Sequence, residues 1–87
     1  MRRTRLSLDL LTRRVDTLAK EIDSRLAVAG VVGAKGRSNY AEVLLAIRGC
    51  EDEPCRLTIG VSRVASLEEM RMAIRKPVEA YLRRHVH

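Results

Sequence analysis

Hydrophobic and polar residues alternate over two short segments in the middle of the chain. The apolar positions are Val43, Leu45 and Ile47 before a short turn, and Leu57, Ile59 and Val61 after it. A period of two is typical of a strand that buries one face. The pattern therefore predicts an antiparallel β-hairpin over 40–63. On its other face Gly60 stands in mid-strand, which indicates either a close approach by another group or one weak position on a solvated surface.

The register of this hairpin has to satisfy two demands. Matching the apolar faces pairs Ile47 with Leu57 and places Gly49 opposite Cys55. Pairing Cys50 with Cys55 would instead put the two apolar sets on opposite faces of the sheet. An extra residue in one strand reconciles the demands, and glycine is a usual residue at such a site. We therefore predict a β-bulge at Arg48-Gly49.

Before the hairpin, apolar residues recur at steps of three and four. They are Leu8, Leu11, Val15, Leu18, Ile22, Leu26 and Ala29. This spacing predicts an amphipathic helix from about Leu8 to about Ala29, with Ser7 as its N-cap. Gly30 and Gly33 are expected to end it, and 33–39 reads as a loop.

A second helix is predicted after the hairpin. Ser66 and Glu69 have the spacing of a capping box, in which each side chain accepts a hydrogen bond from the other residue's amide. Apolar residues then follow at helical spacing to about Arg84. Pro77 lies within that pattern and removes a backbone donor, so we expect a kink and restart near 75–77.

These elements predict an α+β fold in the order α-β-β-α, with one hairpin packed on two helices. The expected organisation is a basic N-terminal arm, 1–7, and a single domain, 8–87. A two-stranded sheet is marginal in water and has two open edges. We therefore expect a homodimer. Alternatively, a third segment covers one edge and the monomer suffices.

Composition adds a positive charge to this picture. The chain has 87 residues, a net charge of +6, and neither Phe nor Trp. That charge favours nucleic acid or an acidic protein surface as partner, although it also serves solubility. The N-terminal apolar stretch is interrupted by Asp9 and ends at Arg13, which is too short for a secretory signal. We expect a cytoplasmic protein with no membrane partner.

Uncompensated cations mark a candidate nucleic-acid-binding surface. Its expected members are Arg2, Arg3, Arg5, Arg14, Lys35, Arg37, Arg48 and Arg56. The first three form the arm, and Lys35 and Arg37 lie in a glycine-flanked loop whose amides could also hold a phosphate. Arg48 and Arg56 are expected side by side on the hairpin. Acidic residues at 51–53 offer an alternative that neutralises this pair within the chain.

The remaining candidate chemistry is sparse. Cys50 and Cys55 flank the hairpin tip and form either a disulfide or two free thiols. Together with His85 and His87 they make a zinc-type ligand inventory, but the spacing is loose and we expect no metal. No nucleophile motif or paired carboxylates indicate an enzyme, a cofactor or a small-molecule substrate. No motif assigns the chain to a family.

Two functions remain open from the sequence. The first is a small basic protein that binds duplex nucleic acid through phosphate contacts as a homodimer. Duplex is preferred because the chain lacks the aromatic residues on which single-stranded bases stack. The second is a protein–protein interaction module, a small regulator, inhibitor or assembly subunit that uses a sheet edge or the first apolar stripe. Whether the arginines share one face distinguishes the two.

Overall fold

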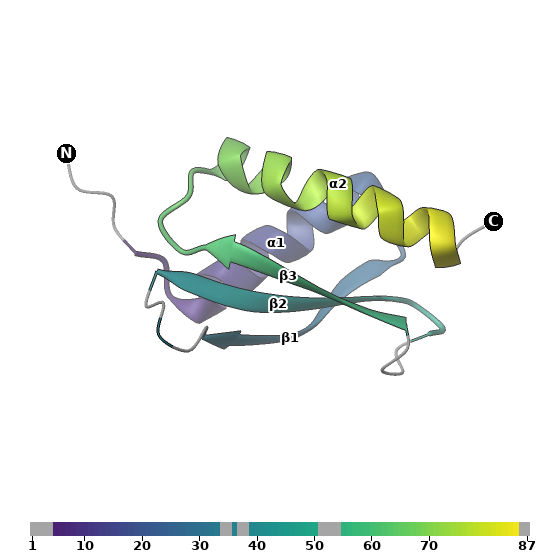
Figure 1. Ribbon diagram of the computed structural model, residues 1–87, viewed down its shortest axis with the longest axis horizontal. Helices are drawn as coiled ribbons and strands as arrows, with labels where there is room; N and C mark the ends of the chain where they lie inside the picture. Colours follow the sequence, from purple (N-terminus) through teal and green to yellow (C-terminus); the bar gives the residue numbers. More distant parts are fainter. Residues whose placement is uncertain (1–4, 34–35, 37–38, 51–54, 86–87) are drawn as a thin grey trace.

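The computed structural model has five elements in the order α-β-β-β-α (Figure 1). It describes residues 5–33, 36, 39–50 and 55–85. The elements are α1 Leu8–Ile22, β1 Leu26–Gly33, β2 Tyr40–Ile47, β3 Arg56–Ser62 and α2 Leu67–His85. The three strands form one antiparallel sheet in the order β1-β2-β3. The α+β class is as predicted, but the sheet has one strand more than expected.

The additional strand replaces the end of the predicted first helix. α1 stops at Ile22, and the carboxylate of Asp23 accepts hydrogen bonds from the amide and the side chain of Arg25. An Asp side chain that bonds its own following backbone competes with helix continuation. The chain then enters β1, where Val28, Val31 and Val32 favour extended backbone. Pairing along β2 also satisfies backbone groups that a lone hairpin would leave open at that edge.

β1 contains an irregularity in its pairing with β2. Val28 pairs with Leu45 and Gly30 with Leu44, so Ala29 is an extra residue in the strand. Because of this bulge, Val28 and Val31 both pack against the core. The expected helix stop at Gly30 and Gly33 is therefore wrong, since both glycines lie within β1.

β2 and β3 form the predicted hairpin in a different register. Leu45 pairs with Leu57 and Val43 with Ile59, a shift of two residues from the expected pairing. A shift of two keeps every side chain on its predicted face. The predicted bulge at Arg48-Gly49 is also wrong: the amide of Cys50 donates to the carbonyl of Ile47 at 3.0 Å, and Gly49 has φ 93°. These features make 47–50 a tight turn that uses glycine's freedom at positive φ.

α2 begins with the predicted capping box. The amide of Glu69 donates to Ser66 Oγ at 3.1 Å, and the amide of Ser66 donates to Glu69 Oε1 at 2.9 Å. The helix continues through Pro77 to His85 without the predicted restart. Met70, Ile74, Val78 and Tyr81 on one side of α2 are buried.

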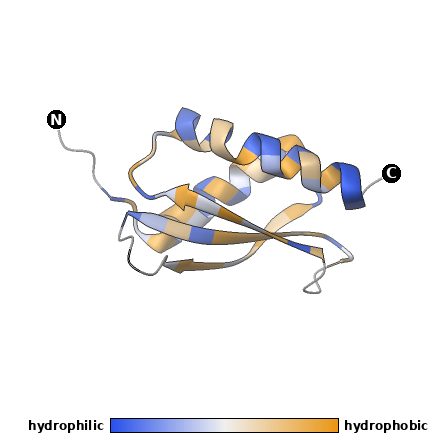
Figure 2. Cartoon of the chain, viewed as in Figure 1, coloured by the Kyte–Doolittle hydropathy of each residue, from blue (hydrophilic) through white to orange (hydrophobic). Residues whose placement is uncertain are grey.

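Both helices pack on the same face of the sheet, which makes a two-layer molecule (Figure 1). The core contains Leu11, Val15 and Leu18 from α1 and the buried residues of α2, together with alternate residues of the strands. Figure 2 shows the strands coloured hydrophobic along much of their length, whereas the helices carry both hydrophobic and hydrophilic colours. No helix covers the opposite face of the sheet among the described residues (Figure 1).

Candidate interaction surface

The side of the sheet that no described helix covers is called here the outer face (Figure 1). Side chains alternate along a strand, so the residues between the core positions point to this side. The strand pairing places them in rows across the sheet. The rows are Tyr40–Ser62, Val32–Glu42–Gly60, Gly30–Leu44–Thr58 and Ala27–Ala46–Arg56.

The middle rows of the outer face are mostly apolar. Leu44 is flanked by Gly30 and Thr58, and the exposed Val32 retains 54% of its accessible surface. A Cβ placed on Gly60 or on Gly30 would meet no atom within 4 Å. Nothing in the described chain therefore fills the space above either glycine, and the surface could receive another molecule closely.

Charge on the outer face is divided between its two ends. Glu42 is the only acid in these rows and forms no ion pair with the described residues. At the other end Arg56 lies opposite Ala46, and the amide of Arg48 donates to the carbonyl of Arg25 at 2.8 Å. The face is consequently acidic toward one end of its strands and basic toward the other.

A shallow cleft lies at the basic end, with a volume of about 290 Å³. Its cations are Lys20, Arg25 and Arg48, and alanines of β1 and β2 form part of its lining. Asp16 pairs with Lys20 at 2.6 Å, and Asp23 pairs with Arg25 at 2.6 Å. The hydrogen bonds from Arg25 lower the pKa of Asp23 to about 2. Two of the three cations are thus already balanced by acids of the same chain.

The free edge of β1 is partly occupied by its own chain. The amide of Val28 donates to Asp16 Oδ1 at 3.2 Å, and the amide of Leu26 donates to the carbonyl of Asp23 at 3.1 Å. Burial opposes ionisation of Asp16, but the hydrogen bonds from Lys20 and from the amide of Val28 outweigh it and lower its pKa. Using up edge amides in this way discourages another strand from pairing there. The outer face is therefore a better candidate surface than this edge.

The described members of the predicted nucleic-acid surface lie in three separate places. Arg2, Arg3, Lys35 and Arg37 lie outside the described residues. The amide of Leu6, which follows Arg5, donates to the carbonyl of Arg63 just beyond β3. Arg56 is at the opposite end of β3, about 23 Å away for seven residues of extended chain.

The other described members lie on α1 and at the basic end of the outer face. Arg14 is half-buried on α1, on the helical side of the sheet. The expected cross-strand pair of Arg48 and Arg56 is wrong, because Arg56 faces Ala46 and Arg48 lies in the tight turn. The acids at 51–53, expected to neutralise this pair, lie outside the described residues.

Sequence reasoning missed the contribution of β1 to the candidate surface. Ala27, Gly30 and Val32 belong to the outer face, and Arg25 belongs to its basic end. The signal was present in Val31 and Val32 between two glycines, which is typical of a short strand. It was overlooked because Leu26 and Ala29 continue the helical spacing of the preceding segment.

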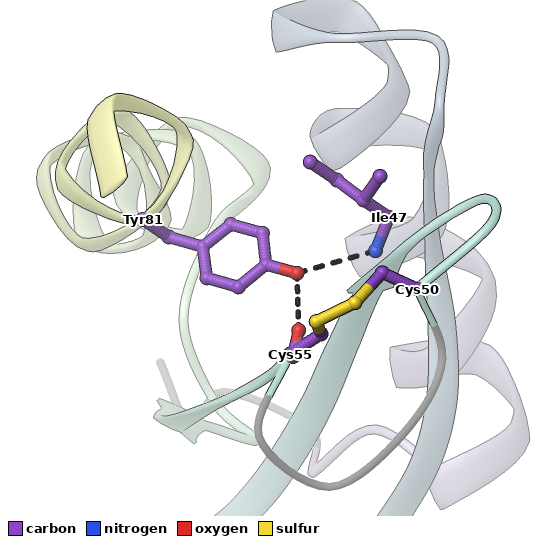
Figure 3. The surroundings of a disulfide bond; sticks show 4 residues. All are labelled: Ile47, Cys50, Cys55 and Tyr81. Carbon is purple, nitrogen blue, oxygen red and sulfur yellow. Dashed lines mark hydrogen bonds between the residues drawn. A yellow bond between two sulfur atoms is a disulfide. The ribbon is translucent and has the colours of Figure 1, made fainter. Parts of the chain in front are cut away.

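The hairpin tip is joined by a disulfide between Cys50 and Cys55, with their Cα atoms 5.7 Å apart (Figure 3). Tyr81 of α2 lies directly against it. Its hydroxyl oxygen accepts a hydrogen bond from the amide of Ile47 at 3.3 Å and donates to the carbonyl of Cys55. The ring of His85 lies 4.5 Å from the Tyr81 ring. With both sulfur atoms in this bond, the two cysteines are not arranged as metal ligands.

The remaining observations do not assign a function. Among the described residues there is no group of three or more His, Cys, Asp or Glu side chains that could hold a metal ion. Within the same part of the chain, no helix has the length and apolar character needed to cross a membrane. The chain matched no known family model, no curated protein and no solved structure in comparisons with each.

Proposed function

We propose that this chain is a small, non-enzymatic protein-interaction module that binds another protein through the outer face of its sheet. The observation that supports this function best is the uncovered, largely apolar sheet surface centred on Leu44. The largest apolar patch on a small protein covers roughly 300–600 Å² and is often functional. Gly30 and Gly60 leave space for close packing by the partner.

The position of the cations supports the same preference. Phosphate contacts along a duplex need cations that share one side of the protein. Arg14 is on the helical side of the sheet, and Arg5 lies near the opposite end of β3 from Arg56. This dispersion favours an interaction module over the duplex-binding function that the charge first suggested.

The experiment is site-specific photo-crosslinking in the producing cell. A photoreactive amino acid replaces Thr58 on the outer face or, as a matched control, Lys76 on exposed α2. We expect Thr58 to give defined protein crosslinks that the Lys76 position does not give. A partner identified in this way, purified, should bind the wild-type protein at least about tenfold more tightly than Leu44→Lys, because the variant buries a charge in an apolar contact. Equal crosslinking at both positions, or unchanged binding by Leu44→Lys, would contradict the proposal.

Nucleic-acid binding is the second candidate, and the basic end of the outer face favours it. Arg25, Arg48 and Arg56 lie there together, with Lys20 at the adjoining cleft. The test is fluorescence anisotropy of a random-sequence duplex at low and at near-physiological salt. If these arginines contact phosphates, replacing one by Ala should reduce the slope of log K against log salt by about 0.9. Absence of binding at low salt would exclude this candidate.

A further inference from the structure

β3 forms one outer edge of the sheet, because β2 lies between it and β1. The amide of Arg63 donates to the carbonyl of Asn39 at 2.6 Å, and these two residues continue the register of β2 and β3. Hydrogen-bonded pairs recur at every second residue of an antiparallel ladder. The odd-numbered residues of β3 therefore bond to β2, whereas the amides and carbonyls of Thr58 and Gly60 point away from it.

The pairing on the other side of β2 agrees with this assignment. The amide of Arg48 donates to the carbonyl of Arg25 at 2.8 Å, in register with the pair of Ala46 and Ala27. The even-numbered residues at this end of β2 therefore bond to β1. They lie opposite even-numbered residues of β3, whose own amides and carbonyls consequently face the open side of the sheet.

The outward groups of Thr58 and Gly60 form no hydrogen bond with the described residues. Both residues are exposed, and the exposed surface of Gly60 is main chain because glycine has no side chain. The next outward positions are already engaged: the carbonyl of Ser62 accepts from the amide of Ala65, and Arg56 has an interaction within the chain. The open part of this edge is therefore 58–60, with two donors and two acceptors.

The opposite edge of the sheet, along β1, is blocked by its own chain. The amide of Val28 donates to Asp16, and the amide of Leu26 donates to the carbonyl of Asp23. An edge strand left unblocked is a template for pairing with another strand. Since no described residue occupies the outward groups at 58–60, β3 is the edge at which a strand can be added.

We infer that β3 pairs with β3 of a second copy in antiparallel orientation, which joins the two three-stranded sheets into one. The free groups are arranged symmetrically about Ile59. A two-fold axis perpendicular to the sheet at Ile59 sets Thr58 of each copy opposite Gly60 of the other. Each of these pairs exchanges two hydrogen bonds, so all four free groups of each chain gain a partner. The contact goes beyond the proposed function, because it leaves the outer face of both copies uncovered.

The side chains of β3 suit this register. Thr58 lies beside the glycine of the other copy, and Ile59 lies beside its symmetry mate on the core side, where aliphatic cross-strand pairs are favourable. Arg56 would lie opposite Ser62, about 20 Å along the strand from the other Arg56. The arrangement therefore requires no contact from Arg56. A parallel arrangement in register would set the two arginines side by side, which is unfavourable.

α2 leaves room for the second copy beside this edge. α1 packs mainly over β1 and α2 over β3, and Arg71 and Arg75 line the cleft between the two helices. At about 3.6 residues per turn, Ala73, Pro77 and Ala80 lie on the opposite flank of α2, toward the edge of β3. Short side chains let neighbouring helices approach to about 8 Å. The two copies of α2 can thus lie side by side over the joined sheet.

The small size of the contact predicts a weak dimer. Pairing over 57–61 buries far less than the roughly 800 Å² per partner that is typical of a stable interface. We therefore expect a dissociation constant on the order of 100 µM, with exchange between monomer and dimer.

The experiment is sedimentation equilibrium of the full chain from about 1 µM to about 1 mM, a range that brackets this dissociation constant. Thr58→Pro removes an outward donor but no bond to β2, and proline is tolerated in an edge strand at such a position. It should raise the dissociation constant at least about tenfold. Thr58→Val keeps the amide and favours a strand, so its dissociation constant should stay within about threefold of the wild-type value.

Leu44→Lys separates this inference from the proposed function. Leu44 lies on β2, on the outer face and away from the edge of β3. The variant should dimerise like the wild type even though it is expected to lose the partner of the outer face. Thr58→Pro tests only the pairing of two copies.

Amide hydrogen exchange of the wild type provides a measurement that does not depend on the folding of any variant. The amides of Thr58 and Gly60 should exchange about fourfold more slowly at 1 mM than at 10 µM protein, the factor expected for a dissociation constant of about 100 µM. The amide of Asp9, in the first turn of α1, is the control and should not change. A monomer at every concentration would overturn the inference. A dimer whose Thr58 and Gly60 amides exchange at the monomer's rate would place the interface elsewhere and also overturn it.

Discussion

Tyr81 joins the C-terminal helix to the hairpin tip through a single hydroxyl group. The side chain is 1% exposed, and its oxygen serves the amide of Ile47 and the carbonyl of Cys55 (Figure 3). Buried polar groups need such partners, because a group left unpaired loses its hydration without compensation. One side chain of α2 therefore satisfies both strands of the hairpin at their shared end.

Tyr81→Phe should lower the free energy of unfolding by about 1–3 kcal/mol, since the ring still fills its site while two backbone groups lose their partner. Urea denaturation monitored by circular dichroism measures this difference. Tyr40→Phe is the control, because an exposed hydroxyl can exchange its contacts with water, and its effect should stay within about 0.5 kcal/mol. Equal effects of the two variants would show that the Tyr81 hydroxyl has no special role.

At the scale of elements, the N-terminal halves of both helices could be predicted and the first strand could not. Ser7 and the Ser66–Glu69 pair act as the caps that their spacing indicated. Caps are local signals, so neighbouring residues suffice to identify them. β1 is decided by pairing with β2, the next strand in the chain, and this pairing is not visible in the residues of β1 alone. Its Leu26 continued the helical spacing by coincidence.

The hairpin shows the same limit of local information. Its apolar faces were correct because alternation is visible in the sequence, whereas its register was wrong by two residues. Registers that differ by two bury the same side chains, so the apolar pattern alone cannot distinguish them. The relative positions of Arg48 and Arg56 depend on that register. The composition of the candidate surface was therefore harder to predict than the fold class.

Asp23 lies between the end of α1 and the start of β1. The stabilising contribution of its carboxylate should be lost at acidic pH. Its pKa in the folded chain is about 2, against an ordinary value of 3.8. A lowered pKa contributes stability above the ordinary value, and that contribution is lost as pH falls. The free energy of unfolding should therefore decrease from about pH 4 to about pH 2. Asp23→Asn should reduce this decrease without abolishing it, because the pKa of Asp16 is also lowered.

Denaturant titrations at several pH values in this range measure the effect. The variant should have lower stability than the wild type near neutral pH. The difference should shrink as the pH falls toward 2 and vanish below it, where the wild-type carboxylate is itself protonated. A constant difference between the two proteins across the whole range would contradict the assignment of the acid sensitivity to Asp23.

At the scale of the whole molecule, stability depends on the core between the helices and one face of the sheet. It also depends on the disulfide at the tip of the β2–β3 hairpin. The Cys50–Cys55 bond closes a loop with a sequence separation of five. Loop-closure entropy for so short a ring amounts to about 2 kcal/mol. Reduction should thus lower the melting temperature by about 10 °C for a domain of this size. Calorimetry with and without a phosphine reductant measures the shift, and a double Cys→Ser variant should melt like the reduced protein in both conditions.

The same bond bears on where the protein resides. Disulfides persist mainly in oxidising compartments, and a reducing cytoplasm keeps most thiols free. The cytoplasmic location expected from the sequence stays a prediction, and the disulfide is the observation that weighs against it. A mass measurement of the protein taken from its native cell under alkylating conditions would distinguish one cross-linked pair from two alkylated thiols.

Arg63, just after β3, is hydrogen-bonded to two segments that are distant from it in the chain, at Asn39 and at Leu6. These contacts limit how early the N-terminal segment can be fixed while the chain is being synthesised. The amide of Arg63 donates to the carbonyl of Asn39 at 2.6 Å, while its carbonyl and its guanidinium group bond the backbone of Leu6 at 2.8 and 2.9 Å. The first described residues therefore receive their fixed position only after residue 63 of the 87 has been made. Until β3 and then α2 have been synthesised, the apolar side of α1 has no complete core to pack against. A nascent chain interrupted before α2 would expose the side chains that later become the interior, and such species are prone to aggregate.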